Sequence, residues 1–186
     1  KKKIKFSLNP SLEAQFASIS DDIAYNSHDL EDGLKSNLFK LKDLKNIPVL
    51  DKIIIKHIKK MNSYSIDLII RQIIREIINE MVSDVIYTTR FNIKINKIKN
   101  LNDIYKAKIQ LVAFSDEMKI FDNKIKKFLK QKMYFNKKVN LKTNYGRKVI
   151  TKLFKSIKRD PKKYIDIDKY NNSNLERIIC DYIAGM

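Results

Sequence analysis

Apolar side chains recur at helical spacing along much of the chain. At about 100° per residue, six apolar side chains in the first long stretch fall within a band of about 60°: Leu12, Phe16, Ile19, Ile23, Leu30 and Leu34. This stripe predicts a long amphipathic helix that buries one face. Ser11 is a plausible N-cap for it, and Glu13 is favourable in its first turn.

Two further helices are predicted from the middle of the chain. Pro48 suits the first turn of a helix whose apolar side is Ile53, Ile54, Ile55 and Ile58. The stretch from Tyr64 to about Thr89 is apolar on several sides, which is typical of a central helix. Its β-branched residues permit a strand, but its length and its spacing of three to four residues favour a helix. Asp84 falls inside its apolar band, and we expect a buried acid paired with a Lys or Arg.

The last third of the chain predicts three more helices. Ser115 caps the first, which has a core face of Met118, Phe121, Ile125, Phe128, Leu129 and Met133. The second stops before Pro161 and carries Val149, Ile150, Leu153, Phe154 and Ile157. A capping box of Ser173 and Glu176 opens the last, with Leu175, Ile178, Ile179, Tyr182, Ile183 and Met186.

The connections between these helices are polar. Loops are predicted at residues 37–46 and 164–172, residues 92–103 are predicted as a loop or a ragged helix end, and the apolar run 110–114 reads as a short extended piece. With so few strand and turn signals, the predicted fold class is all-α. A chain of 186 residues that is 44% hydrophobic can bury one sizeable core, so a single helical region over 1–186 is the default.

The face opposite the first stripe has an unusual composition. Asp21, Tyr25, His28 and Asp32 lie across from the apolar band, and Asp29 sits at its edge. Small side chains surround them, at Ala14, Ala17, Ser18 and Ala24. A solvated face usually carries long Lys, Glu and Arg, yet no Lys occurs between Leu12 and Leu34. An ordinary surface helix remains one interpretation. The other is that a cation or a closely packed neighbour lies against this face of the helix.

Four stretches resemble one family. The run SLEAQFASISDDIAYNSHDLEDGL, from Ser11 to Leu34, is similar to a helix of bacterial deoxyguanosinetriphosphate triphosphohydrolase-like proteins, a branch of the HD-domain phosphohydrolases. CDYIAGM at the chain's end resembles their C-terminal motif, and VAFSDEMK and IKKFLKQKMYFNKKV resemble helices between the two. The resemblance implies an all-α, HD-domain-type helical array, of which this chain would be the C-terminal part. Residues 1–36 would form the last part of the core that carries the metal site, and residues 37–186 would form the C-terminal helical part.

The resemblance also implies site residues. Asp21, which precedes a Tyr by one helical turn, matches the last Asp of the family's His…His-Asp…Asp metal set. Asp22 is the rival, but it points about 100° away. Tyr25 and Asp29 match the pair that holds the deoxyribose, where the acid accepts a hydrogen bond from the 3′-hydroxyl and the ring occupies the place of a 2′-hydroxyl. Tyr134 would line the nucleotide pocket, although relatives carry a His nearby where this chain has Phe135 and Asn136.

The implied activity is metal-dependent hydrolysis of a deoxynucleoside triphosphate, dGTP above all, to deoxynucleoside and triphosphate. A carboxylate with imidazoles suits a divalent ion such as Mn, Fe, Co, Ni or Zn, with Mg also open. The family's first His and its His-Asp pair lie upstream of Asp21, and no His precedes Asp21 here. We therefore expect this chain alone to be inactive, and we assign it no catalytic residue.

Other polar residues have plainer interpretations. His28 is expected to support or pack rather than to bind metal, and His57 is assigned no role. Cys180, the only cysteine, excludes an internal disulfide and is typical of a reducing compartment. Arg177 is expected in helix packing or a subunit contact. Asp21, Tyr25, Asp29 and Tyr134 therefore remain the candidate site.

The formal charge of +18 raises the alternative of a basic nucleic-acid-binding module. We discount it because the lysines are scattered and only six of the basic residues are Arg; weak nucleic-acid binding stays open. A non-catalytic remnant that assembles with an intact copy is the other alternative. No apolar run reaches the ~18 residues of a membrane span, and no signal peptide is visible, so we expect a cytoplasmic homo-oligomer without membrane contact.

Overall fold

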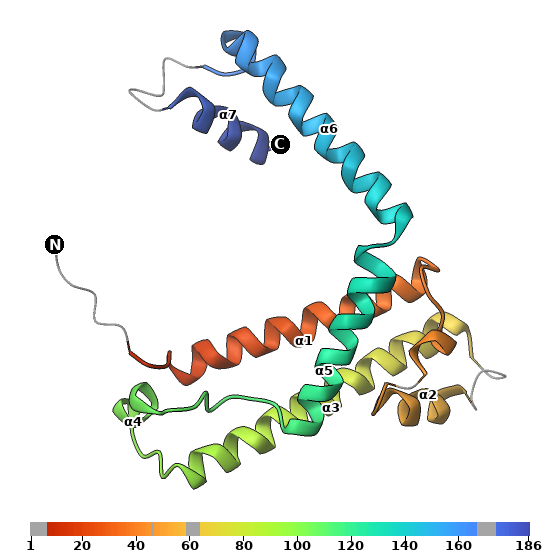
Figure 1. The fold of residues 1–186 in the computed structure, drawn as a ribbon, viewed down its shortest axis with the longest axis vertical. Coiled ribbons are helices and arrows are strands. Elements are labelled where there is room, and N and C mark those ends of the chain that lie inside the picture. Colours follow the sequence, from red (N-terminus) through yellow and green to blue (C-terminus); the bar gives the residue numbers. More distant parts are fainter. Residues whose placement is uncertain (1–6, 46, 59–63, 167–173) are drawn as a thin grey trace. The chain divides into compact units, whose positions relative to one another are not determined.

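The computed structural model describes residues 7–45, 47–58, 64–166 and 174–186. Within these ranges the regular elements are all helical and none is a strand (Figure 1), so the all-α prediction is confirmed. The chain forms two compact units, residues Lys1–Tyr134 and Phe135–Met186. The predicted boundary at residue 36 falls inside the first unit, and it stays a prediction.

The first unit contains α1 to α5. In chain order its elements are α1 (Leu12–Lys35), the 3₁₀ turn η1 (Leu41–Leu44), α2 (Leu50–Ile58), α3 (Ile66–Ile95), α4 (Leu101–Lys106), α5 (Asp116–Leu129) and the π-helical turn η2 (Lys130–Tyr134). The second unit consists of α6 (Lys137–Arg159), the 3₁₀ turn η3 (Pro161–Lys163) and α7 (Leu175–Ala184).

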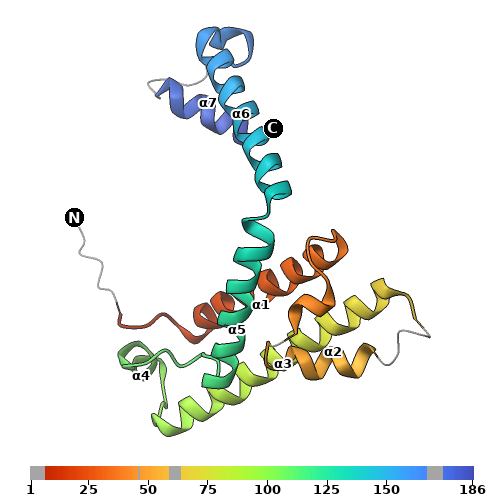
Figure 2. The same ribbon diagram turned by 45° about the vertical axis from the view of Figure 1, so that its right-hand side comes forward.

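The core of the first unit lies where α1 packs against α3 and α5 crosses α1, an arrangement seen in both views (Figures 1 and 2). The α2 helix packs on α3. Side chains from all four helices meet in one cluster, and its most buried members on these helices are Leu30, Leu50, Ile54, Ile69, Ile73, Ile77, Met81, Phe121, Ile125 and Leu129. The α1 stripe read from the sequence therefore faces this core.

Two helices end in the same hydrogen-bonded motif without a glycine. After α1, the Leu38 amide donates to the Gly33 carbonyl at 2.9 Å, and Asn37 adopts a φ of 54°. After α3, the Ile98 amide donates to the Ile93 carbonyl at 3.1 Å, and Lys97 adopts a φ of 53°. This is the Schellman arrangement, in which a left-handed residue closes the last turn. Because Lys97 stands where glycine is usual, the end of α3 has only a weak sequence signal.

The predicted helices are confirmed, but Pro48 lies in a turn before α2, which begins at Leu50, and not in its first turn. Three further adjustments concern later parts of the chain. The α3 helix runs past Thr89 to Ile95, and α4 occupies part of the loop predicted at residues 92–103. The run 110–114 is irregular rather than a strand. The buried Gln15 side chain accepts hydrogen bonds from the Leu111 and Val112 amides, at 3.0 and 3.1 Å, so these groups need no strand partner.

The second unit has a small core of its own. The α7 helix packs along the C-terminal half of α6, and Ile157, Ile165, Ile178 and Ile179 are buried between them. In the structure Asn174 caps α7 by accepting from the Glu176 amide at 2.9 Å. The predicted cap Ser173 lies outside the described residues, as do residues 1–6. Among the described residues, no helix combines the length and apolar character that a membrane crossing requires.

We predict that Gly33→Ala destabilises the first unit. A Cβ at position 33 would lie 2.2 Å from Cε1 of Phe39, which is buried and packs edge-on against Phe128 with ring centroids 4.9 Å apart. The Phe39 ring would have to shift out of its present packing, so the overpacking should cost about 1–3 kcal/mol. Amide hydrogen exchange of α1 should speed up correspondingly.

Gly146→Ala is the matched control, because a Cβ there meets nothing within 4 Å and the residue is also inside a helix. The alanine should stabilise α6 by about 0.5–1 kcal/mol, and amide exchange in α6 should slow correspondingly. Equal slowing in both variants would contradict the proposed clash at Phe39.

Candidate functional site

Three of the side chains predicted from the sequence meet at the end of α5. The α1 helix supplies Tyr25 and Asp29 one turn apart, and Tyr134 is the last residue of the π-helical turn. The Tyr134 hydroxyl donates a hydrogen bond to the Asp29 carboxylate, across 105 positions of the sequence. Burial, together with hydrogen bonds to Asp29 and Tyr25, raises the pKa of the Tyr134 phenol.

The exposure of these residues leaves room for a ligand. Tyr25 is 58% exposed, whereas Asp29 and Tyr134 are half-buried. A carboxylate can accept several hydrogen bonds at once, so Tyr134 occupies only part of the capacity of Asp29. The arrangement therefore combines a fixed acceptor with two aromatic rings, which suits a ligand that carries a hydroxyl group beside an apolar face.

A buried polar contact fixes the crossing of α1 and α5 next to this site. The Asn26 side-chain amide donates to Asp122 at 2.9 Å, and both residues are more than nine-tenths buried. Asn26 lies between Tyr25 and Asp29 on α1, on the face turned toward α5. Because a buried polar group costs free energy unless it is paired, this hydrogen bond favours one register of the two helices.

Lys126 extends the same contact toward solvent. Its ammonium lies 2.9 Å from Asp122 and 3.2 Å from Asp22 on α1. Burial alone would lower the pKa of Lys126, but the two carboxylates outweigh it and raise the pKa. Asp22, the rival of Asp21 in the sequence, is thus tied to α5.

Asp21 is exposed on α1. Among the described residues, no group of three or more His, Cys, Asp or Glu side chains is placed to hold a metal ion. A single exposed carboxylate does not fit a divalent ion by itself. Asp21 as a metal ligand remains a prediction, and the residues that the structure describes do not complete such a site.

The other candidates lie elsewhere. His28 is exposed, and its Nδ1 is 4.0 Å from Glu31, so it does not pack as expected. Arg177 is exposed and pairs with Asp181 one turn along α7 at 2.9 Å. Cys180 is an exposed free thiol.

Asp84 does not pair with a Lys or Arg as the sequence predicted. It accepts a hydrogen bond from the Ser115 amide at 2.8 Å and so joins α3 to the start of α5. Ser115 in turn accepts from the Met118 amide at 3.2 Å, which confirms its predicted role as a cap.

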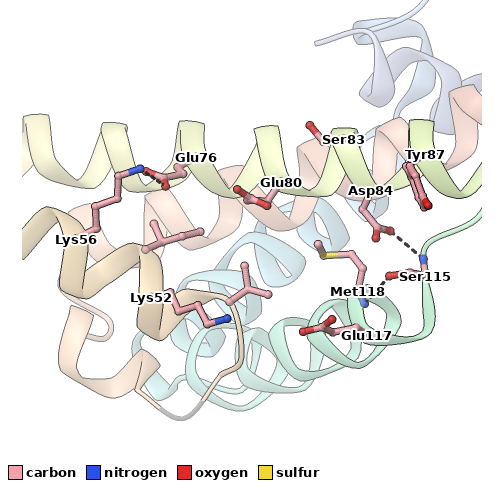
Figure 3. Close-up of a pocket in the computed structure, with 12 residues that line it drawn as sticks. Lys52, Lys56, Glu76, Glu80, Ser83, Asp84, Tyr87, Ser115, Glu117 and Met118 are labelled. Carbon is pink, nitrogen blue, oxygen red and sulfur yellow. Dashed lines mark hydrogen bonds and ion pairs between the residues drawn. The ribbon is translucent and has the colours of Figure 1, made fainter.

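A separate groove of about 460 Å³ runs between α2, α3 and the start of α5 (Figure 3). Lys56 pairs there with Glu76 at 2.7 Å, and the hydrogen bond from Lys56 lowers the pKa of Glu76. On the buried side, His57 lies 2.5 Å from the same carboxylate. Sequence analysis missed this pairing because its partners are 19 and 20 positions apart on different helices. Neither Tyr25, Asp29 nor Tyr134 is among the described residues that line the groove.

Comparison with known proteins matches the whole of this chain. A protein of Pelagibacter ubique, named deoxyguanosinetriphosphate triphosphohydrolase-like protein, is 44% identical over 186 residues, which are 100% of this chain and 50% of that protein. Proteins with the same name from Rickettsia typhi and Geobacter sulfurreducens are 34% and 31% identical, over 95% of this chain and 47% and 46% of their own lengths. This chain is homologous to the deoxyguanosinetriphosphate triphosphohydrolase-like proteins. The resemblance seen in its motifs is confirmed.

The match places the site within the region shared with these homologues. The family model of the phosphohydrolase-associated domain matches residues 112–186, which include Tyr134. Tyr25 and Asp29 precede that domain but lie inside the alignment with the Pelagibacter ubique homologue. The chain spans about half the length of the curated relatives it matches.

We predict that Tyr134 keeps its proton at pH values where an ordinary tyrosine, with a pKa of ~10, has lost it. The raised pKa means that the folded state holds this proton more tightly than the unfolded state. The free energy that this proton contributes to the stability of the folded state is therefore fully present below pH ~10. It is lost as the pH rises above that value.

The measurement is a ¹³C NMR titration of labelled tyrosines, with Tyr134→Phe to assign the resonance. The Tyr134 Cζ signal should not move between pH 9 and pH 11, a range chosen as about one unit on each side of the ordinary pKa. A shift centred near pH ~10 would show that the hydrogen bond to Asp29 is absent in solution.

Proposed function

We propose that this chain is part of a deoxynucleoside-triphosphate triphosphohydrolase, which converts substrates of the dGTP type to deoxynucleoside and triphosphate. The names of its homologues support the reaction class. The observation that carries the proposal for this chain is the hydrogen bond between Tyr134 and Asp29, with Tyr25 beside it.

In this proposal the three residues bind the deoxyribose. Tyr134 donates to one oxygen of Asp29 and so orients the carboxylate, whose remaining lone pairs accept the 3′-hydroxyl of the sugar. The exposed Tyr25 ring packs where a ribose would carry its 2′-hydroxyl. A ribonucleotide would then bring a polar group into a place with no partner for it, which disfavours its binding.

We further propose that Asp21 contributes one carboxylate to a divalent metal site. The described residues of this chain do not complete such a site. The remaining ligands would come from sequence outside this chain, because the homologues are about twice as long. The identity of the ion stays open among Mn, Mg, Fe, Co, Ni and Zn. Turnover by this chain alone is not expected.

A chimera tests the role of Asp29. This chain replaces the matching half of the Pelagibacter ubique homologue, and triphosphate release from dGTP is measured. Asp29→Asn should lower kcat/KM at least ~10-fold, because a hydrogen bond to a charged group contributes about 1.5–3 kcal/mol.

Asp32→Asn is the matched control, since Asp32 is an exposed acid on the same helix, and it should leave kcat/KM within about 2-fold. Equal losses in the two variants of a folded chimera would argue against sugar binding by Asp29. Triphosphate release by this chain alone, abolished by Asp21→Ala, would show that no further ligands are needed.

We also propose that the chain associates with further copies. Exposed apolar side chains support this: Tyr87, Phe91 and Ile109 line a groove of about 810 Å³ and are 75%, 52% and 45% exposed. Apolar surface of this kind marks interaction sites when it is contiguous.

Sedimentation equilibrium tests the association. Phe91→Ser should weaken self-association at least ~10-fold, because it removes the transfer free energy of a large aromatic side chain. Ile120→Ser, an exposed apolar residue on α5 that does not line the groove, should not. A monomer at all accessible concentrations would dismiss the proposal.

A further inference from the structure

The α6 helix is more than twice as long as the helix that packs on it. It has 23 residues and α7 has 10, so at 1.5 Å per residue they span ~34 and ~15 Å. The α6 side chains in the shared core are Leu153, Phe154 and Ile157, and both views show α7 beside the C-terminal half of α6 (Figures 1 and 2). About 19 Å of α6 therefore extends beyond the length of α7.

A ridge of exposed apolar side chains lies on this uncovered part of α6. Leu141, Tyr145 and Val149 recur every four residues and are 63%, 71% and 44% exposed; we call them the α6 ridge. Residues at this spacing form one row on a helix surface, inclined by about 26° to the helix axis. The row continues through Leu153 and Ile157, which pack against α7. The α6 ridge is therefore the uncovered end of a row that already makes a helix–helix contact.

Cations flank the α6 ridge on both sides. The neighbouring rows carry Lys138 and Lys142 on one side and Lys148 and Lys152 on the other, and all four side chains are exposed. The helix contains neither Asp nor Glu. Among the ion pairs that the structure gives for the described residues, none involves these four lysines. A partner with acidic side chains would therefore be attracted to both flanks of the ridge.

The α7 helix shows which kind of partner α6 already accepts. It packs through an apolar side that includes Ile178 and Ile179, and its Glu176 pairs with Lys158 of α6 at 2.5 Å. Lys158 belongs to the same row of α6 as Lys142, because the two positions are sixteen residues, or four steps of four, apart. The covered half of α6 thus binds a helix that has an apolar stripe and an acid at its edge.

We propose that the α6 ridge is a docking site for an acidic amphipathic helix of another protein. The ridge is one side chain wide, and the groove between two rows of a second helix fits such a ridge. A membrane surface would require a broad apolar face, which the flanking lysines interrupt. The α6 helix of a second copy would bring nine further cations and no acid, so charge disfavours that pairing. The proposal rests on α6 and α7 alone and is independent of the proposed hydrolase function.

Fluorescence anisotropy of a labelled synthetic helix tests the docking, with the full chain as the receptor. The peptide has about 14 residues, enough to cover the free part of α6, with Leu three or four residues apart and Glu and Ala elsewhere. The double variant Leu141→Ser, Tyr145→Ser should weaken binding at least ~10-fold, because two large apolar side chains lose their buried contact. Ile120→Ser is the matched control on α5, with Ile120 55% exposed, and it should change the affinity less than ~2-fold.

Two further peptides separate helix docking from attraction by overall charge. One has the same composition in a scrambled order without an apolar stripe, and the other has Lys in place of every Glu. Each should bind at least ~10-fold more weakly than the acidic helix. Equal binding of the scrambled peptide, absence of binding by the acidic helix, or binding of the chain to phosphatidylserine vesicles that the double variant abolishes would each overturn the proposal.

The remaining outcomes concern occupants other than a separate protein. In a Cys180→Ser background, Val149→Cys should react with a maleimide reagent as fast as a cysteine in an unstructured peptide, and the acidic helix should slow the reaction. Slow reaction without the peptide would show that the rest of this chain already covers the ridge. Self-association in sedimentation equilibrium that the double variant abolishes would assign the ridge to a second copy. Either result would overturn the proposal.

Discussion

The crossing of α1 by α5 is the contact on which the candidate site depends. Asp29 and Tyr134 are 105 positions apart, and they meet only because α5 lies across α1 in one register. Apolar packing of Leu30, Phe121 and Ile125 holds the helices together but tolerates small slips. The buried hydrogen bond from Asn26 to Asp122 does not, because a slip would leave the buried Asn26 amide without its partner.

The π-helical turn adds a second constraint at the same place. It follows α5 directly and ends at Tyr134. A π turn widens the helix and changes the direction of its side chains relative to a continuous α-helix, and such turns are frequent at functional sites. The orientation of Tyr134 toward Asp29 therefore depends on a local backbone feature that helical periodicity does not encode.

The spacing of apolar and polar residues predicted the helices well. It predicted poorly which side chains and backbone groups contact one another. The α1 stripe and the cap at Ser115 follow from spacing and from side-chain chemistry within a few residues. The end of α3 at Ile95 was missed because the left-handed residue that follows it, Lys97, is not a glycine. Asp84 was predicted to pair with a cation, but it binds the Ser115 amide, since a backbone donor 31 positions away is invisible to sequence pattern.

The candidate residues came from motif resemblance, and the structure adds which of them meet. Nothing in the spacing of Tyr25 and Asp29 indicates that Tyr134 reaches them; that requires the helix crossing. Asn26 and Asp122 escaped notice because each alone is an ordinary polar residue in a helix. Their importance becomes visible only through burial, as both are more than nine-tenths covered.

The distribution of charge is more informative here than its total. A formal charge of +18 in a lysine-rich chain says little about any one surface. Two helices differ from this average composition in opposite ways. Between Leu12 and Leu34 α1 has no Lys or Arg, whereas α6 has no Asp or Glu. Where lysine is the default residue, its absence from this part of α1 means that Asp22 finds its cation on another helix, at Lys126 of α5. The absence of acids from α6 likewise means that Lys158 finds its carboxylate on another helix, at Glu176 of α7. A compositional bias shared by the whole chain cannot account for both departures.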